Sequence, residues 1–339
     1  MLKKVLKRIA KGFLILLLLL VVVYLLGPRP RKPILDDTPM VLSIGLEGLD
    51  TYVQDKEAQV TNLKINNQAE IVWIDSVPTQ TKYSIVYLHG FSASHAEGDP
   101  IHRNIAKRYG ANLYLSRLAR HGINDLDIWA EMKGEELIET TKEAIAIGKK
   151  LGEKVILMGC STGLTYGLYL AANDPDIVGI VSYSPNIDMY DPKSALLAGP
   201  WGLQLARWIV GSKHREYEAT EDVKKYWMNK YRIEGLIALK MVINQTMVEE
   251  VFQKIKQPLF LGYYYKNEEE QDKTVSVARM LEMYEQLGTA NDQKRKVAFP
   301  DAGTHVISSK YHSTPEELAK VEKETILFLE EIMKLKPVE

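Results

Sequence analysis

The chain has 339 residues, with 43 basic side chains, 44 acidic side chains and one cysteine. Residues 1–32 hold eight of the basic side chains and no acidic one, so the remaining chain carries 35 basic and 44 acidic groups, a net charge of −9. This acidic balance argues against nucleic-acid binding, which requires a basic face. A single cysteine also excludes an internal disulfide bond.

The N-terminal segment is predicted to be a membrane anchor. Five basic residues precede an unbroken apolar run over residues 13–26, and residues 28–33 are prolines and basic residues. Residues 9–27 together approach the roughly 20 residues that a bilayer requires. No small-residue cleavage site follows Leu26, which favours an uncleaved anchor over a removed signal peptide. The basic excess before the run predicts that the rest of the chain lies on the non-cytoplasmic side.

An apolar strand is predicted over residues 83–88, and it leads into His89-Gly90-Phe91-Ser92. The glycine lets the backbone turn back across the top of a sheet. The backbone N–H of Phe91 is then placed to donate to an oxyanion, a role that requires no particular side chain. His89 is interpreted as a structural residue that braces this loop, because a general base in such a scaffold comes last in the chain.

The most informative motif is Gly159-Cys160-Ser161-Thr162-Gly163. It follows a buried strand predicted over residues 154–158 and precedes a helical pattern over residues 164–172, so the chain must turn sharply here. Glycines at both ends remove side chains that would clash in such a turn. We predict that Ser161 is a nucleophile, that the Thr162 N–H is a second oxyanion donor, and that Cys160 is a small core residue.

Residues 187–256 are predicted to be helical and to form a lid over the active site. This stretch interrupts the alternation of strands and helices, and it is rich in aromatic residues and methionine: Trp201, Trp208, Tyr217, Tyr226, Trp227, Met228, Tyr231, Met241 and Met247. Each of them alone is more often a packing residue than a ligand contact. As a group they favour an apolar acyl or aryl substrate.

The general base is predicted to be His305. It lies on a glycine-containing loop after the strand-like residues 295–299 and before a long terminal helix. A histidine at this place in the chain can reach a serine at the same edge of the sheet. His312, seven residues further on, is the alternative base.

The acid of the triad is predicted to be Asp272. It belongs to a short acidic loop after the apolar strand 258–265. A short acid before an apolar helix start can turn inward while it caps that helix. Glu268 and Glu270 in the same loop remain alternatives.

These motifs resemble the α/β-hydrolase superfamily, and within it the capped serine hydrolases that include monoacylglycerol lipases, lysophospholipases and carboxylesterases. The resemblance covers residues 70–335. Besides the serine and histidine motifs above, the Arg120-His121-Gly122 turn and Asp272 before Val275 carry it. It implies an eight-stranded, mostly parallel sheet flanked by helices, with a lid after the sixth strand. The expected parts are an anchor (1–33), a hydrolase core (34–186 and 257–339) and a lid (187–256).

The sequence therefore predicts a membrane-anchored serine hydrolase that acts on carboxylic esters of small to medium lipid-like substrates. The triad would be Ser161, Asp272 and His305, and the chemistry needs no metal or organic cofactor. Amide hydrolysis and acyl transfer on the same triad are alternatives. A non-catalytic receptor with the same fold is an alternative from another class, because this fold does not fix a function.

Overall fold

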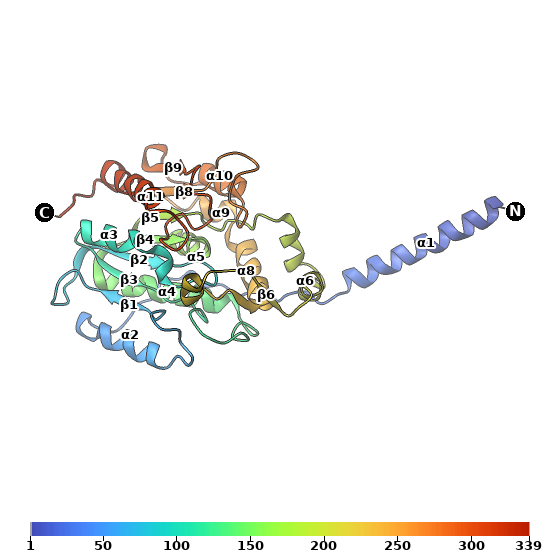
Figure 1. Cartoon of the computed structure of the whole chain (residues 1–339), viewed down its shortest axis with the longest axis horizontal. Coiled ribbons are helices and arrows are strands. Elements are labelled where there is room, and N and C mark those ends of the chain that lie inside the picture. Colours follow the sequence, from blue (N-terminus) through green and yellow to red (C-terminus); the bar gives the residue numbers. More distant parts are fainter. Residues whose placement is uncertain (1, 339) are drawn as a thin grey trace.

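A seven-stranded sheet runs through the centre of the computed structural model, which describes residues 2–338 (Figure 1). The strands stand in the order β1-β3-β2-β4-β5-β8-β9, and each neighbouring pair is parallel except β1 and β3. In chain order they are β1 (Glu70–Val72), β2 (Thr81–Leu88), β3 (Asn112–Leu115), β4 (Gly152–Cys160), β5 (Ile177–Tyr183), β8 (Leu259–Tyr263) and β9 (Lys294–Ala298). The predicted α/β class with a mostly parallel sheet is confirmed.

The number of strands in this sheet is corrected from the implied eight to seven for residues 2–338. The chain before β1 forms a short 3-10 turn, Leu46–Gly48, and then helix α2, Leu49–Ala58. Leu49 and Val53 are the buried residues of α2, and their spacing of four places both on one helical face. This segment therefore covers the sheet instead of extending it.

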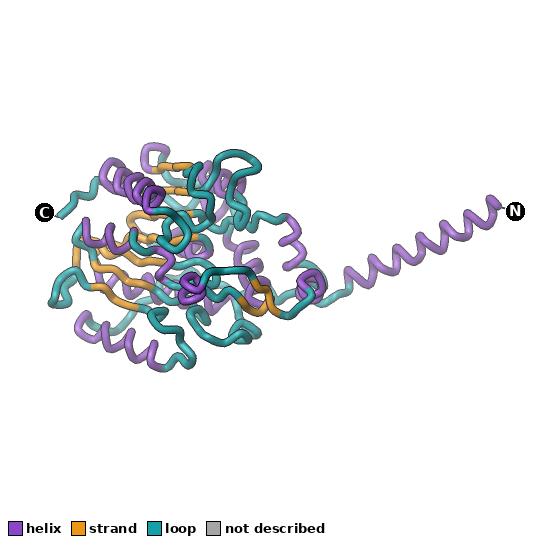
Figure 2. The backbone as a smooth tube through the Cα atoms, viewed as in Figure 1, coloured by secondary structure: helices purple, strands orange, loops and turns teal. Residues whose placement is uncertain are grey.

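Helices cover both faces of the sheet (Figure 2). One face packs against a hydrophobic cluster to which α2 and five further helices contribute: α4 (Gly134–Leu151), α5 (Thr162–Ala171), α8 (Ile233–Thr246), α9 (Glu249–Phe252) and α10 (Val277–Gln286). The other face packs against α3 (Ile101–Arg108) and α11 (Pro315–Leu327). The sheet is thus the middle layer of three.

The strand sequences explain this two-faced burial. In β2, Val86 and Leu88 belong to the first cluster, whereas Ile85 and Tyr87 belong to the second. Successive side chains of a strand point to opposite faces, so a strand covered on both sides is apolar at every position. This is why residues 85–88 read as a continuous apolar run.

The insertion, residues 187–256, lies between β5 and β8. It contains α6 (Gly202–Val210), α7 (Glu221–Tyr226), α8 and α9 (Glu249–Phe252), and also a two-stranded antiparallel ribbon of β6 (His214–Glu216) and β7 (Lys230–Arg232). The expectation of a wholly helical insertion is corrected by this ribbon, whose three-residue strands are too short to show an alternating pattern. Helix α8 packs against α4 and α5 and attaches the insertion to the helical layer.

Helix α1 (Leu2–Leu25) projects away from the rest of the molecule, and none of its residues is buried (Figure 1). By length and composition it could cross a membrane, a criterion that a signal sequence near an N-terminus also meets. The residues after it lie against the body. The Ile34 N–H donates to Glu135 Oε1 at 2.9 Å, and the Gln245 amide donates to the Pro33 carbonyl at 3.2 Å.

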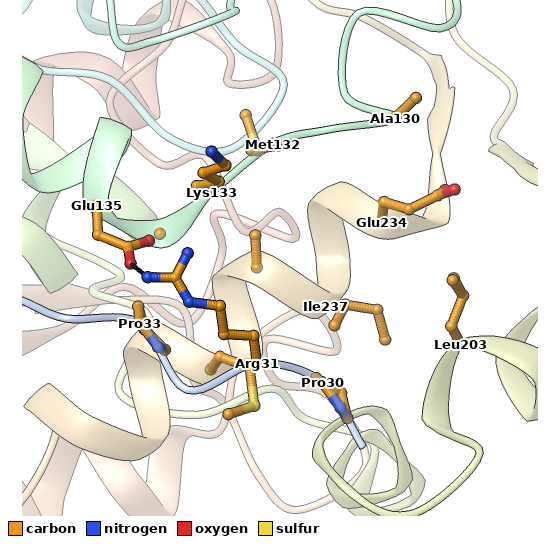
Figure 3. Close-up of a pocket in the computed structure, with 13 residues that line it drawn as sticks. Pro30, Arg31, Pro33, Ala130, Met132, Lys133, Glu135, Leu203, Glu234 and Ile237 are labelled. Atoms are coloured by element: carbon orange, nitrogen blue, oxygen red, sulfur yellow. Dashed lines mark ion pairs between the residues drawn. The ribbon is translucent and has the colours of Figure 1, made fainter. Parts of the chain in front are cut away.

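A cavity of about 200 Å³ lies where this N-terminal segment meets α4 and α8 (Figure 3). Arg31 and Glu135 form an ion pair of 3.1 Å in its lining. None of the residues predicted for the active site lines this cavity. We therefore treat it as a feature of the junction between α1 and the body.

Candidate active site

Ser161 occupies the sharp turn between β4 and α5. Its backbone has φ 53° and ψ −124°, a region that a residue other than glycine rarely adopts. Such strain persists only where the surrounding structure imposes it, and it is concentrated at functional sites. The Ser161 N–H donates to the carbonyl of Tyr183 on β5 at 2.9 Å, which fixes the turn over the sheet edge. The serine is 6% exposed.

The two glycines of the motif allow the turn to pack against β2. A methyl group on Gly159 would lie 2.3 Å from the carbonyl oxygen of Leu88, and one on Gly163 would lie 2.2 Å from the same oxygen. Both contacts involve backbone, which cannot move aside as a side chain can. The motif therefore needs glycine at both positions for close approach between the turn and β2.

His305 and Asp272 form a hydrogen bond beyond the carboxyl ends of β9 and β8. His305 Nδ1 lies 2.6 Å from Asp272 Oδ2, and Asp272 is only 1% exposed. The other oxygen, Oδ1, accepts the N–H groups of Thr274 at 2.8 Å and Val275 at 3.1 Å. These bonds orient the carboxylate and satisfy it, so that it can hold the imidazole with its proton on Nδ1.

The electrostatics around His305 favour its protonated form. Burial alone would lower the pKa of His305, but the negative charge and hydrogen bond of Asp272 outweigh it and raise the pKa above the ordinary 6.5. The charge of Glu97 acts in the same direction. This imidazole can therefore hold a proton taken from a hydroxyl.

The alternative residues lie elsewhere. Glu268 and Glu270 are exposed, and Glu270 pairs with Lys266 at 2.9 Å. His312 packs edge-on against Trp227, with 4.7 Å between ring centroids, and burial lowers its pKa to about 4. Of the carboxylates in the 266–272 loop, Asp272 is the one that meets His305.

The two predicted oxyanion donors lie beside the serine turn. Thr162 is the first residue of α5, where helix N–H groups have no partner within the helix, and Phe91 follows Gly90 on the neighbouring loop. Neither N–H donates a hydrogen bond to any residue in the described range 2–338. The Cβ of Ser161 lies 3.1 Å from the position of a methyl on Gly90, so the two loops are in contact.

His89 braces the loop through both ring nitrogens. Its Nε2 accepts the Leu118 N–H at 3.0 Å, so the proton must be on Nδ1, which donates to the carbonyl of Gly90 at 2.9 Å. Burial holds the pKa of His89 well below its usual value, with the charge of His121 acting in the same direction. A neutral imidazole bonded on both sides is a structural element of the loop.

The insertion contacts this loop directly. The Met228 N–H donates to the carbonyl of Ser92 at 2.7 Å, and the hydroxyls of Tyr217 and Ser92 are 3.4 Å apart. Tyr231 meets the ring of Phe91 edge-on, with centroids 5.4 Å apart. The insertion is therefore fixed beside the predicted oxyanion donors.

One buried carboxyl group near the site has no signal in the sequence. Glu97, in the 3-10 turn His95–Gly98, accepts the Gly90 N–H at 2.7 Å and the Tyr87 hydroxyl at 3.3 Å through Oε2. No periodicity or motif marks Glu97, because its burial depends on contacts with β2 and the loop after it. The one hint in the sequence is that Glu97 is the acidic residue in a stretch, residues 92–98, that consists mostly of small residues.

The sheet order and the elbow between β4 and α5 are those of the α/β-hydrolase fold, which the sequence motifs predict and which the similar proteins share. No model of a protein family matches the chain. A thermostable monoacylglycerol lipase of Bacillus sp. (strain H-257) is 28% identical over 165 residues, which is 48% of this chain and 62% of the lipase. The match thus spans less than two thirds of that relative.

Solved structures show the same fold. One belongs to work on LipS and LipT, two metagenome-derived lipolytic enzymes, with a TM-score of 0.62 and 15% identity over 79% of this chain and 99% of that one. Another is a soluble variant of monoglyceride lipase from Saccharomyces cerevisiae bound to a substrate analogue. It has a TM-score of 0.50 and 12% identity, and the comparison covers 78% of this chain and 91% of that one.

Proposed function

We propose that this protein is a serine hydrolase that cleaves carboxylic esters of small to medium lipid-like substrates through an acyl-enzyme. The observation that carries the proposal is the 2.6 Å hydrogen bond between His305 and the buried Asp272. It lies at the same end of parallel strands as the strained Ser161. Nucleophile, base and orienting acid are the three parts that such chemistry requires.

In the proposed reaction, Ser161 Oγ attacks the ester carbonyl carbon while His305 Nε2 takes the serine proton. The N–H groups of Phe91 and Thr162 bind the resulting oxyanion. Collapse of this intermediate breaks the ester C–O bond, and the imidazolium returns the proton to the leaving alcohol. A water molecule, deprotonated by His305, then attacks the acyl-enzyme and releases the carboxylic acid and Ser161. Asp272 keeps the Nδ1 proton in place throughout.

An apolar acyl group is favoured by the surroundings of Phe91. Its ring packs against Trp129, at 4.4 Å between centroids, and against Tyr231 of the insertion. Aromatic side chains beside a binding position are typical of sites for apolar ligands. The name of the Bacillus relative, a monoacylglycerol lipase, supports the same substrate class. In this proposal the insertion acts as the lid.

We also propose that α1 is an uncleaved membrane anchor with the body on the non-cytoplasmic side. Five basic residues precede its apolar run and three follow it, a bias that favours an N-terminus in the cytoplasm. The end of α1 is joined to the insertion, since Trp201 Nε1 donates to the Val23 carbonyl at 3.1 Å and the Trp201 N–H to the Pro28 carbonyl at 2.7 Å.

The surface beside the base of α1 supports a membrane-facing orientation. Helix α6 lies there in Figure 1, and its last turn exposes Trp208 (80% exposed), Ile209 and Val210. Three adjacent exposed apolar residues on a helix next to a membrane anchor fit the bilayer interface, where tryptophan is enriched. The insertion would then face the lipid that holds its substrate.

Hydrolysis of p-nitrophenyl esters from acetate to palmitate by the full chain in detergent micelles tests the proposal. We expect activity with the wild type and its loss in Ser161→Ala and His305→Ala. Added glycerol separates hydrolysis from acyl transfer by the products formed. A folded wild type that is inert on every ester would leave amide substrates and the non-catalytic alternative.

A further inference from the structure

Glu97 is a buried carboxyl group without a basic partner. It is 2% exposed, and it forms no ion pair within residues 2–338. Its Oε2 accepts two hydrogen bonds, from the Gly90 N–H at 2.7 Å and the Tyr87 hydroxyl at 3.3 Å. A buried carboxylate that has no cation beside it is costly, and the usual outcome is that the group keeps its proton.

The other oxygen of Glu97 faces the serine turn. A methyl group on Gly90 would lie 2.7 Å from Glu97 Oε1 and 3.1 Å from the Cβ of Ser161. Glu97 Oε1 and the Cβ of the proposed nucleophile therefore border the same small space, which is open because Gly90 has no side chain. Within the described part of the chain, Oε1 makes no hydrogen bond.

Few charges surround this carboxyl group. The titratable groups whose charges act on Glu97 or feel its charge are Tyr87 of β2, Cys160 of β4, Tyr217 of the insertion and His305. Helix α7 also packs against the 3-10 turn, and its charged side chains pair with one another at the surface: Glu221 with Lys224 and Asp222 with Lys225. His95 of the same turn is held neutral by its own burial, which lowers its pKa. Among the groups whose charges interact with that of Glu97, His305 is the one that becomes positively charged during the proposed reaction.

We propose that Glu97 is a positioning residue of the active site that works in its protonated form: Oε2 holds the Gly90 N–H, and with it the turn that presents the Phe91 N–H, while a proton on Oε1 keeps negative charge away from the oxyanion. This inference rests on the proposed ester hydrolysis at Ser161. It adds an acid to the site that stands outside the triad.

In this proposal, the protonation state of Glu97 controls the rate of ester hydrolysis near neutral pH. Burial raises the pKa of Glu97 to about 7, although the Gly90 hydrogen bond, the charge of His305 and the Tyr87 hydroxyl all act to lower it. An ionised Glu97 would repel the oxyanion that forms beside Gly90. It would also raise the pKa of His305 and so keep protonated the group that must accept the serine proton. Both effects lower the rate as Glu97 loses its proton.

The test is the pH profile of kcat/KM for a water-soluble short-chain ester between pH 5 and 10, measured with the full chain in micelles. Glu97→Gln keeps the shape and the acceptor for the Gly90 N–H but cannot ionise. We expect a bell-shaped profile for the wild type. In Glu97→Gln the alkaline limb disappears and the acid limb moves to lower pH, so that at pH 9 the variant exceeds the wild type about 10-fold or more. Glu153→Gln, an exposed site on β4, is the matched control and keeps both limbs.

The outcomes separate this inference from the proposed function. An active wild type whose two limbs are unchanged in Glu97→Gln, or a variant that is uniformly weaker at every pH, overturns the role of the Glu97 proton and leaves the triad standing. A wild type that neither hydrolyses esters nor reacts with a fluorophosphonate at Ser161 overturns the proposed function, and the inference fails with it.

Discussion

The carbonyl oxygen of Leu88 lies 2.2 Å from the point where a methyl group on Gly163 would sit. This contact joins the last residue of β2 to the first turn of α5, and it sets the distance between the serine turn and the His89–Ser92 loop. The packing of two backbone segments, more than any side chain, therefore shapes the proposed site.

Gly163→Ala should destabilise the protein, because the new methyl would collide with backbone that has no room to move. We expect the free energy of unfolding to fall by about 2–4 kcal/mol, with loss of esterase activity at temperatures where the fold survives. Urea unfolding followed by circular dichroism measures this. Gly12→Ala is the control, since a methyl there meets no atom within 4 Å, and equal stability of the two variants would contradict the packing argument.

Asp272→Asn should lower kcat/KM by about 1,000- to 10,000-fold while the fold is retained, because the amide no longer secures the Nδ1 proton of His305. In the wild type, the pKa of His305 is raised, so the neutral base is lost as pH falls through a value above 6.5. Activity should therefore decline on the acid side of that value. A decline centred well below pH 6.5, or an Asn variant with near wild-type activity, would show that this pair does not act as base and acid.

Trp208 should lie in the headgroup region if α6 rests on the bilayer. In vesicles that contain the full chain, lipids brominated on the acyl chain should quench part of the tryptophan fluorescence. The chain has five tryptophans, and Trp208 is the most exposed residue at the end of α6. The Trp208→Phe variant should therefore lose the part of the fluorescence that the brominated lipids quench. Equal quenching in wild type and variant would place α6 away from the lipid.

The sharp turn at Ser161, the loop position of His305 and the mostly parallel sheet could be predicted from the sequence because each leaves a local pattern. A glycine-framed serine between a strand and a helix marks the turn, and apolar runs mark strands that are covered on both faces. The relation of His305 to Asp272 could be expected from chain order. The choice among the acids of that loop depends on burial, and a charged loop gives no periodicity from which burial can be read.

Other features lie beyond such patterns. The β6–β7 ribbon consists of two three-residue strands, shorter than any alternation can reveal. Glu97 comes to lie beside the serine turn only because β2 and the following loop close over it. A tertiary contact of this kind leaves no mark in the neighbouring residues.

The buried acid has a further consequence for stability. The pKa of Glu97 rises from its ordinary 4.5 to about 7, so between these values the unfolded chain loses this proton before the folded one does. Stability should therefore fall as pH rises across that window, by about 3 kcal/mol from this group alone. In urea unfolding at pH 4.5 and pH 8, Glu97→Gln should gain about that amount relative to the wild type at the higher pH. A stability difference that does not change with pH would mean that Glu97 is not protonated in the fold.

The most direct test of the central claim is labelling of the full chain with a fluorophosphonate, followed by intact mass and peptide mapping. The account predicts a single adduct on Ser161, its absence in Ser161→Ala, and labelling of His305→Ala that is slower by orders of magnitude, because the serine loses its base. A folded wild type that remains unlabelled, or an adduct that persists in Ser161→Ala, would contradict the assignment of Ser161 as the nucleophile.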